Sequence, residues 1–136
     1  MDRQGSVDMK RILIDSNVYS AYKTGNPAVI RDFQSFEEIH INITVLAELL
    51  AGFKAGSKEA LNRQELKLFL NSPRVVLDQV TEGTAEFYAH IYLVLRSKGT
   101  PIPTNDIWIA ASAMQNGCAL YSSDKHFHVV DGLLLV

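Results

Sequence analysis

Short apolar runs alternate along this chain with longer segments of helical periodicity. The runs at 12–14, 39–43, 74–79, 118–121 and 132–136 are each of a length that suits one buried strand. The segments between them predict five helices. The first two cover 17–23 and, from an N-cap at Thr44, about 45–53; the third covers 58–70. The fourth includes 87–95 and ends at Gly99, and the fifth runs from Thr104 or Asn105 to Asn116. Strands separated by helices of roughly 10–15 residues form right-handed crossovers. We therefore predict an α/β fold with a mostly parallel central sheet of about five strands and helices on both faces.

The chain has the length and the apolar content of one domain. Its 136 residues are 47% hydrophobic and 21% charged, which matches one globular domain rather than two. We assign residues 9–136 to this domain and treat the polar residues 1–8 as an N-terminal extension. Cys118 is the only cysteine, so an internal disulfide is excluded, and no Cys/His cluster has the spacing of zinc ligands.

Charge and hydropathy exclude several classes of protein. The net charge of −2 and the pI near 6.0 argue against a basic nucleic-acid binder whose affinity comes from counterion release. Nucleic acid would have to be held by a local basic rim or by a bound cation. No stretch approaches the ~18 apolar residues that a membrane span requires. We expect a soluble, cytoplasmic protein that does not associate with membranes.

Four carboxylates stand in sequence that is otherwise almost free of charge. Asp15 is the only charged residue between Arg11 and Lys23, and Glu48 is the only one in 43–53. Asp106 is the only one in the 25 residues 99–123, and Asp124 follows directly. Burying an unpaired carboxylate costs several kcal/mol, so an acid in apolar sequence needs a partner or a cation.

The predicted topology brings these acids toward one end of the sheet. Asp15 and Asp124 follow predicted strands, Asp106 lies in the first turn of a predicted helix, and Glu48 lies one turn into another that leaves a strand. Ligands of open parallel sheets bind beyond the carboxyl ends of the strands, where the strand order reverses. Clustered carboxylates repel one another unless divalent cations neutralise them, and an all-oxygen ligand set favours Mg²⁺ or Mn²⁺. Hydrolysis of phosphodiester bonds by metal-activated water is the chemistry that uses such a site.

Taken singly, each acid also has a structural explanation. Asp15 suits a turn after a strand, Asp106 suits the start of a helix, and Asp124 suits an Asx-turn or an N-cap. Their joint occurrence at strand ends favours a functional site. His126 lies near Asp124 in sequence, where a general acid/base role is conceivable, but we interpret it as a surface or hydrogen-bonded histidine.

Four sequence motifs resemble those of one protein family. They are Ile14-Asp15-Ser16-Asn17-Val18, Thr44-Val45-Leu46-Ala47-Glu48-Leu49-Leu50-Ala51-Gly52, Pro103-Thr104-Asn105-Asp106-Ile107-Trp108-Ile109-Ala110-Ala111 and Leu120-Tyr121-Ser122-Ser123-Asp124-Lys125-His126-Phe127. In this order and at this length they resemble the PIN domains of VapC toxins, over about residues 11–136. Many relatives carry Thr-Asn-Asp where this chain has Ser-Ser-Asp at 122–124.

The resemblance implies a PIN-like fold and a Mg²⁺- or Mn²⁺-dependent endoribonuclease. Such toxins are usually dimeric and are held inactive by a small antitoxin encoded beside them. Carried over by motif, Asp15, Glu48, Asp106 and Asp124 form the catalytic metal site. Asn17, Asn105 and Ser122 match supporting polar positions.

Other functions stay open at this point. One alternative is a PIN nuclease that acts in RNA maturation or on structured DNA. Another is a catalytically silent binding module that acts through its partner. A phosphoryl-accepting domain with Asp15 as nucleophile is disfavoured, because it calls for a second acid at position 17, which is Asn17. The motifs do not select transfer, ribosomal or messenger RNA as the target.

Overall fold

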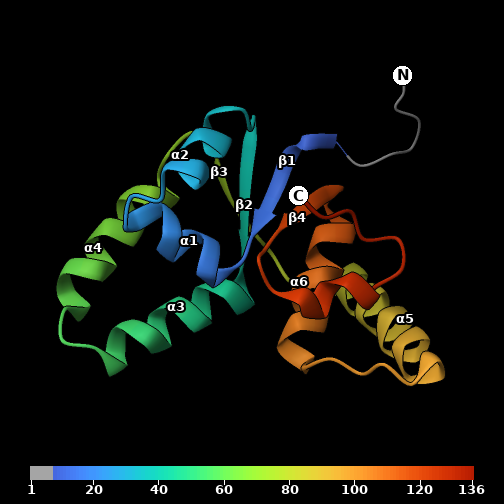
Figure 1. The fold of residues 1–136 in the computed structure, drawn as a ribbon. Coiled ribbons are helices and arrows are strands. Elements are labelled where there is room, and N and C mark those ends of the chain that lie inside the picture. Colours follow the sequence, from blue (N-terminus) through green and yellow to red (C-terminus); the bar gives the residue numbers. More distant parts are fainter. Residues whose placement is uncertain (1–7) are drawn as a thin grey trace.

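A computed structural model describes residues 8–136, which form one open sheet with helices on both faces (Figure 1). The strands are β1 (Asp8–Ile14), β2 (Glu38–Asn42), β3 (Val75–Asp78) and β4 (Cys118–Tyr121), all parallel and ordered β3-β2-β1-β4. The predicted α/β fold with a mostly parallel sheet is confirmed. Of the predicted N-terminal extension, only Asp8 lies within the described residues, and it begins β1.

Six α-helices connect the strands of the described chain. They are α1 (Ser16–Lys23), α2 (Pro27–Gln34), α3 (Ile43–Ala55), α4 (Glu59–Leu70), α5 (Glu82–Lys98) and α6 (Thr104–Gln115), and a 3-10 turn, η1 (Lys125–Val129), follows β4. Figure 1 shows α1, α2 and α4 on one side of the sheet and α5 and α6 on the other. Within residues 8–136, no helix combines the length and the apolar character needed to cross a bilayer.

The core is centred on β1, which lies between β2 and β4. Ile12, Leu13 and Ile14 are fully buried, as expected for a strand whose two faces are both covered by helices. Leu13 pairs with His40 of β2 and with Leu120 of β4. This central position explains why the first apolar run is short and uncharged.

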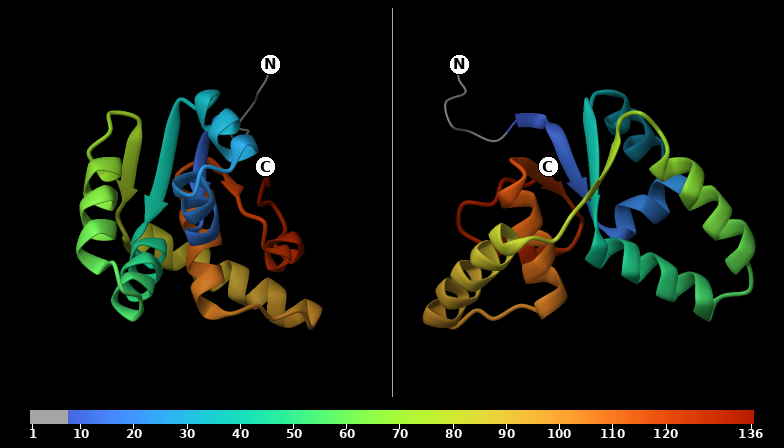
Figure 2. Two further views of the ribbon diagram at one scale, coloured as in Figure 1. Left: turned by 60° about the vertical axis from the view of Figure 1, so that its left-hand side comes forward. Right: turned by 180° about the vertical axis from the view of Figure 1, so that it is seen from behind.

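The strand order determines where a ligand site can lie. From β1 the chain moves through β2 to β3 on one side, and then crosses back to β4 on the other side of β1. The order therefore reverses between β1 and β4, and the residues that follow these two strands meet at the carboxyl edge. The right-hand view of Figure 2, seen from behind, shows the crossing segment from β3 to α5 in front of β2.

The prediction of about five strands is wrong by one. The segment at 132–136 meets β4 at a single bridge between Leu120 and Leu135. The Leu120 amide donates to the Leu134 carbonyl at 2.8 Å, and the Val136 amide donates to the Leu120 carbonyl at 2.9 Å. The segment is apolar because Leu133 is buried against the core, yet it pairs with β4 at one residue and forms no ladder. Apolar character alone does not distinguish a strand that forms a ladder from a segment that is only buried against the core.

One helix boundary differs from the predictions, and one helix was not predicted. The N-cap of α3 is Asn42, whose side chain accepts a hydrogen bond from the Val45 amide at 2.8 Å, so Thr44 lies inside the first turn. The structure also has α2, which was not predicted. Its N-cap is Asn26 and Pro27 occupies the first helical position, where proline is well tolerated. α1 ends at Lys23 with Thr24 as its C-cap, so only Gly25 separates that cap from Asn26.

Candidate active site

Asp15 directly follows β1 and caps the N-terminus of α1. Its Oδ1 accepts a hydrogen bond from the Val18 amide at 2.9 Å, and its Oδ2 accepts one from the Ser122 hydroxyl. Asp15 is only 5% exposed. Burial raises the pKa of Asp15, the two hydrogen bonds oppose this, and the charges of Glu48 and Asp124 raise it further. A cation beside Asp15 would favour its ionised form.

Glu48 reaches the same edge of the sheet from α3, where its side chain is half-buried. Its Oε1 accepts a hydrogen bond from the Ser16 hydroxyl at 3.1 Å, and its Oε2 accepts one from the Asn105 side-chain amide at 2.6 Å. The carboxylate thus connects α3 with the first turns of α1 and α6. Asn105 was a predicted supporting residue, whereas Ser16 was not.

Asp106 and Asp124 meet through His126. Asp106 lies in the first turn of α6 and is 7% exposed. Nδ1 of His126 lies 2.9 Å from Oδ2 of Asp106 and 3.2 Å from Oδ1 of Asp124. The hydrogen bond to Asp106 raises the pKa of His126. Burial opposes this, and the charges of Asp124 and Asp106 raise the pKa further.

Ser122 joins the two halves of the site. Its hydroxyl donates to Asp15 and accepts a hydrogen bond from the Asp124 amide at 2.9 Å. Asp124 in turn caps η1, because its Oδ1 accepts a hydrogen bond from the His126 amide at 2.9 Å. A hydroxyl at position 122 therefore holds the residues after β1 and after β4 against each other.

The structure thus brings the four predicted acids to one edge of the sheet, together with Asn105 and Ser122. Asn17 is exposed in the first turn of α1, and its side chain makes no hydrogen bond to any described residue. His126 has a more specific position than we predicted, since it contacts two of the acids. The nearness of residues 124 and 126 in sequence was the available signal. Whether the acids bind metal or act in catalysis remains a prediction.

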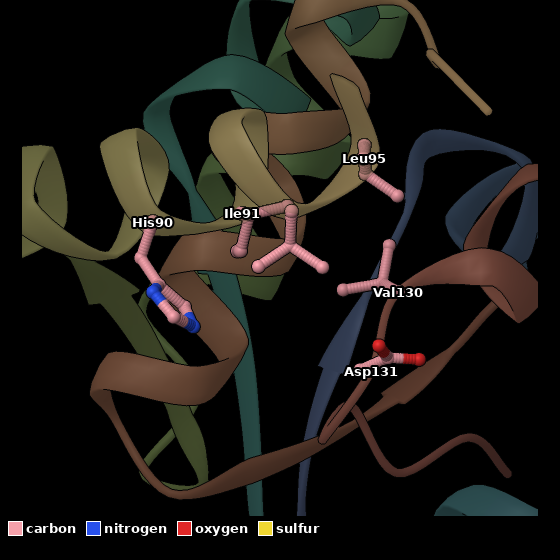
Figure 3. Close-up of a pocket in the computed structure, with 6 residues that line it drawn as sticks. His90, Ile91, Leu95, Val130 and Asp131 are labelled. Atoms are coloured by element: carbon pink, nitrogen blue, oxygen red, sulfur yellow. The ribbon is translucent and has the colours of Figure 1, made fainter. Parts of the chain in front are cut away.

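A separate pocket lies away from these acids. It has a volume of about 140 Å³ and lies between α5 and the segment that follows η1 (Figure 3). Figure 3 shows the aliphatic side chains of Ile91 and Val130 between His90 and Asp131. Asp131 forms an ion pair with Lys98 at 3.0 Å. The pocket therefore offers aliphatic surface and no converging polar groups, unlike the carboxyl edge.

Comparison with known proteins identifies the class to which this fold and site belong. The PIN domain family model matches residues 12–133. Ribonuclease VapC2 of Rickettsia felis is 30% identical over 98 residues, which cover 71% of this chain and 72% of that protein. Ribonuclease VapC5 of Mycobacterium tuberculosis is 25% identical over 123 residues, which cover 88% of this chain and 87% of that protein. The chain belongs to the PIN-domain family and, within it, to the VapC group.

A solved structure has the same fold. VapBC2 from Rickettsia felis, bound to a DNA fragment from its promoter, contains a chain that superposes with a TM-score of 0.82 at 23% identity. The superposition covers 92% of this chain and 96% of that chain. The arrangement of strands and helices described above is therefore that of a PIN domain over nearly the whole chain.

Proposed function

We propose that this VapC-type PIN protein is a metal-dependent endoribonuclease and acts as the toxin of a toxin-antitoxin pair. The observation that carries the proposal is the meeting of Asp15, Glu48, Asp106 and Asp124 at the carboxyl edge, beside the reversal in strand order. The relatives named as ribonucleases support RNA as the substrate. We assign the PIN-like domain to residues 9–136.

The donor set fits Mg²⁺ or Mn²⁺. Within residues 8–136, none of the four acids forms an ion pair with a lysine or arginine. Asp15 is 5% exposed and has no cationic partner among residues 8–136, so its charge calls for a counter-ion. Asp106, which is 7% exposed, contacts only His126 among the described cationic side chains. The four acids would hold the ion, which when bound supplies a water of lowered pKa and positive charge beside the scissile phosphate.

The remaining polar side chains position these acids. Ser122 and the Val18 amide hold both oxygens of Asp15, and Ser16 and Asn105 hold both oxygens of Glu48. Carboxylates fixed in this way need little rearrangement when substrate binds. Asn17 stays a proposed supporting residue on the exposed first turn of α1.

Water rather than the RNA 2′-hydroxyl is the proposed nucleophile. Attack by water on the phosphorus leaves a 5′-phosphate on one product and a 3′-hydroxyl on the other. The half-buried Glu48 lies beside Asp15, close enough for its charge to raise the Asp15 pKa. We assign Glu48 to the attacking water or to a second ion, and the three aspartates to the principal ion.

The proposed partners are RNA, an antitoxin and a second copy of the chain. The solved neighbour is a VapBC2 complex, which supports an antitoxin partner. The homodimer rests on the family resemblance, and the cytoplasmic location rests on the single cysteine, Cys118. Light scattering of the purified chain would test the dimer, with a mass of 30 kDa expected from two chains of 15.1 kDa, and a monomer would contradict it.

Cleavage of total RNA by the purified protein tests the proposed activity. We expect cutting in Mg²⁺ or Mn²⁺, none in EDTA, and loss of cutting in Asp106→Asn. A matched control is Glu86→Gln, which neutralises an exposed acid on α5 and should cut as the wild type does. Equal cutting by wild type and Asp106→Asn would contradict the proposal, because the cutting would then not come from this site. That result would favour a silent binding module.

A further inference from the structure

We propose that His126 is a direct ligand of the divalent ion at this site, through Nδ1 and together with Asp106 and Asp124. The ring therefore makes the site prefer a first-row transition ion such as Mn²⁺ over Mg²⁺. This inference rests on the proposed function, because it names the chemistry of the ion that the four acids would hold. Its test measures the bound ion rather than RNA cleavage.

The spacing of the three side chains carries the inference. Nδ1 of His126 lies 2.9 Å from Asp106 Oδ2 and 3.2 Å from Asp124 Oδ1. Ligands about 2.1 Å from an octahedral ion lie about 3 Å apart when they are adjacent. One potential ligand atom from each of the three residues lies within 4.8 Å of the other two. Ligands on opposite sides of an octahedral ion lie about 4.2 Å apart, which is also within this limit. The two distances from His126 Nδ1 are therefore those of adjacent ligands of one ion, and the limit of 4.8 Å leaves room for a third ligand atom.

The backbone holds the ring in this position. Asp124 caps η1 by accepting the His126 amide at 2.9 Å, so the carboxylate that contacts the ring also fixes the turn that carries it. The His126 side chain is 52% exposed, which leaves an open side for substrate or water. His128 lies two residues further along the same turn and is also exposed, but it makes no ion pair with a described acid.

A neutral imidazole changes which ion the site selects. Nδ1 must lose the proton that it shares with Asp106 in order to bind an ion, and this proton passes to solvent. Mg²⁺ is a hard ion that prefers oxygen ligands, whereas first-row transition ions accept imidazole nitrogen readily. One imidazole nitrogen added to the aspartate ligands therefore favours Mn²⁺ over Mg²⁺, in contrast to a set of carboxylates alone.

Electron spin-echo spectroscopy of Mn²⁺ bound to the full chain tests this ligation directly. A coordinated imidazole produces nitrogen modulation in the echo. We expect this modulation in the wild type and in the matched control His128→Asn, and we expect it to vanish in His126→Asn. Modulation that is absent from the wild type, or that persists in His126→Asn, would overturn the inference.

Competition between the two ions provides the second measurement. Free Mn²⁺ is followed by its room-temperature resonance while Mg²⁺ is added. His126→Asp supplies an all-oxygen ligand set, so it should lower the preference for Mn²⁺ over Mg²⁺ by about tenfold. Changes of outer-shell partners alone already alter metal affinity by about this factor. An unchanged preference in His126→Asp would overturn the proposed selectivity.

The outcomes separate this inference from the proposed function. Mn²⁺ bound without nitrogen modulation, in a protein that cuts RNA, overturns only the role of His126. Nitrogen modulation in a protein that cuts no RNA contradicts only the ribonuclease. If the chain binds no Mn²⁺, the inference fails, and cleavage in Mg²⁺ alone then decides the proposed function.

Discussion

A buried ion-paired histidine in β2 makes the stability of this domain depend on pH. His40 is 3% exposed, with Nδ1 at 2.7 Å from Asp78 Oδ1 and Nε2 at 2.8 Å from Glu38 Oε1. Burial opposes the charged ring, but the hydrogen bonds to Asp78 and Glu38, together with the Cys118 thiol nearby, outweigh it and raise the pKa of His40 to about 10. Glu38 is itself held by Arg11 at 3.2 Å.

The raised pKa sets the sign of the effect. The ring titrates near its ordinary pKa of 6.5 in the unfolded chain and near 10 in the folded one. Between these values the folded state keeps a proton that the unfolded state has released, so the free energy of unfolding falls as the pH rises. The limiting slope is about 1.4 kcal/mol per pH unit. From pH 7 to pH 9 the loss therefore reaches up to about 3 kcal/mol.

Urea unfolding at pH 7, 8 and 9, followed by circular dichroism, measures this slope. We expect the wild type to lose stability across the series and His40→Gln to lose much less. Tyr19 and Tyr121 have pKa values raised to about 12 by burial, so their effect begins above this range. Should His40→Gln not fold, the ring proton signals of wild-type His40 provide the check. A titration of His40 near pH 6.5 in the folded protein would refute the reasoning.

Two further predictions concern hydroxyl and amide groups that hold the site and its helices. Ser122→Ala removes the donor to Asp15, and we expect a loss of about 10- to 100-fold in RNA cleavage, measured beside Ser123→Ala, whose exposed side chain should leave the rate unchanged. Asn42→Ala removes the N-cap of α3 and should lower the free energy of unfolding by about 1–2 kcal/mol, whereas Thr44→Ala should cost only a few tenths of a kcal/mol. A larger effect of Thr44→Ala in urea unfolding would contradict the assignment of the cap.

Hydrophobic periodicity was sufficient to predict most of the fold. The four strands and five of the six helices lie where the apolar runs and the helical segments indicated. The run at 132–136 is apolar because Leu133 packs into the core, and burial does not require a ladder. α2 was not predicted, although Asn26 and Pro27 provide its N-cap and first residue, because asparagine and proline are also common just after the end of a helix.

The candidate site was predictable where it depends on strand ends. Asp15 follows β1 directly, and Asp124 follows shortly after β4, so parallel topology alone places them near each other. The contact between Ser16 and Glu48 joins residues 32 positions apart, and it depends on how α1 and α3 pack. The contact of His126 with Asp106 depends likewise on how η1 meets α6. Periodicity and spacing carry no information on such packing.

The chemical ends of the RNA products test the central claim most directly. Purified protein is incubated with RNA in Mg²⁺ or Mn²⁺, and the ends are determined by labelling with and without prior phosphatase treatment. We expect 5′-phosphate and 3′-hydroxyl ends in the wild type, because water attacks at the carboxylate site, and no products in Asp106→Asn. Products that end in 2′,3′-cyclic phosphate would contradict it, since they require attack by the RNA 2′-hydroxyl.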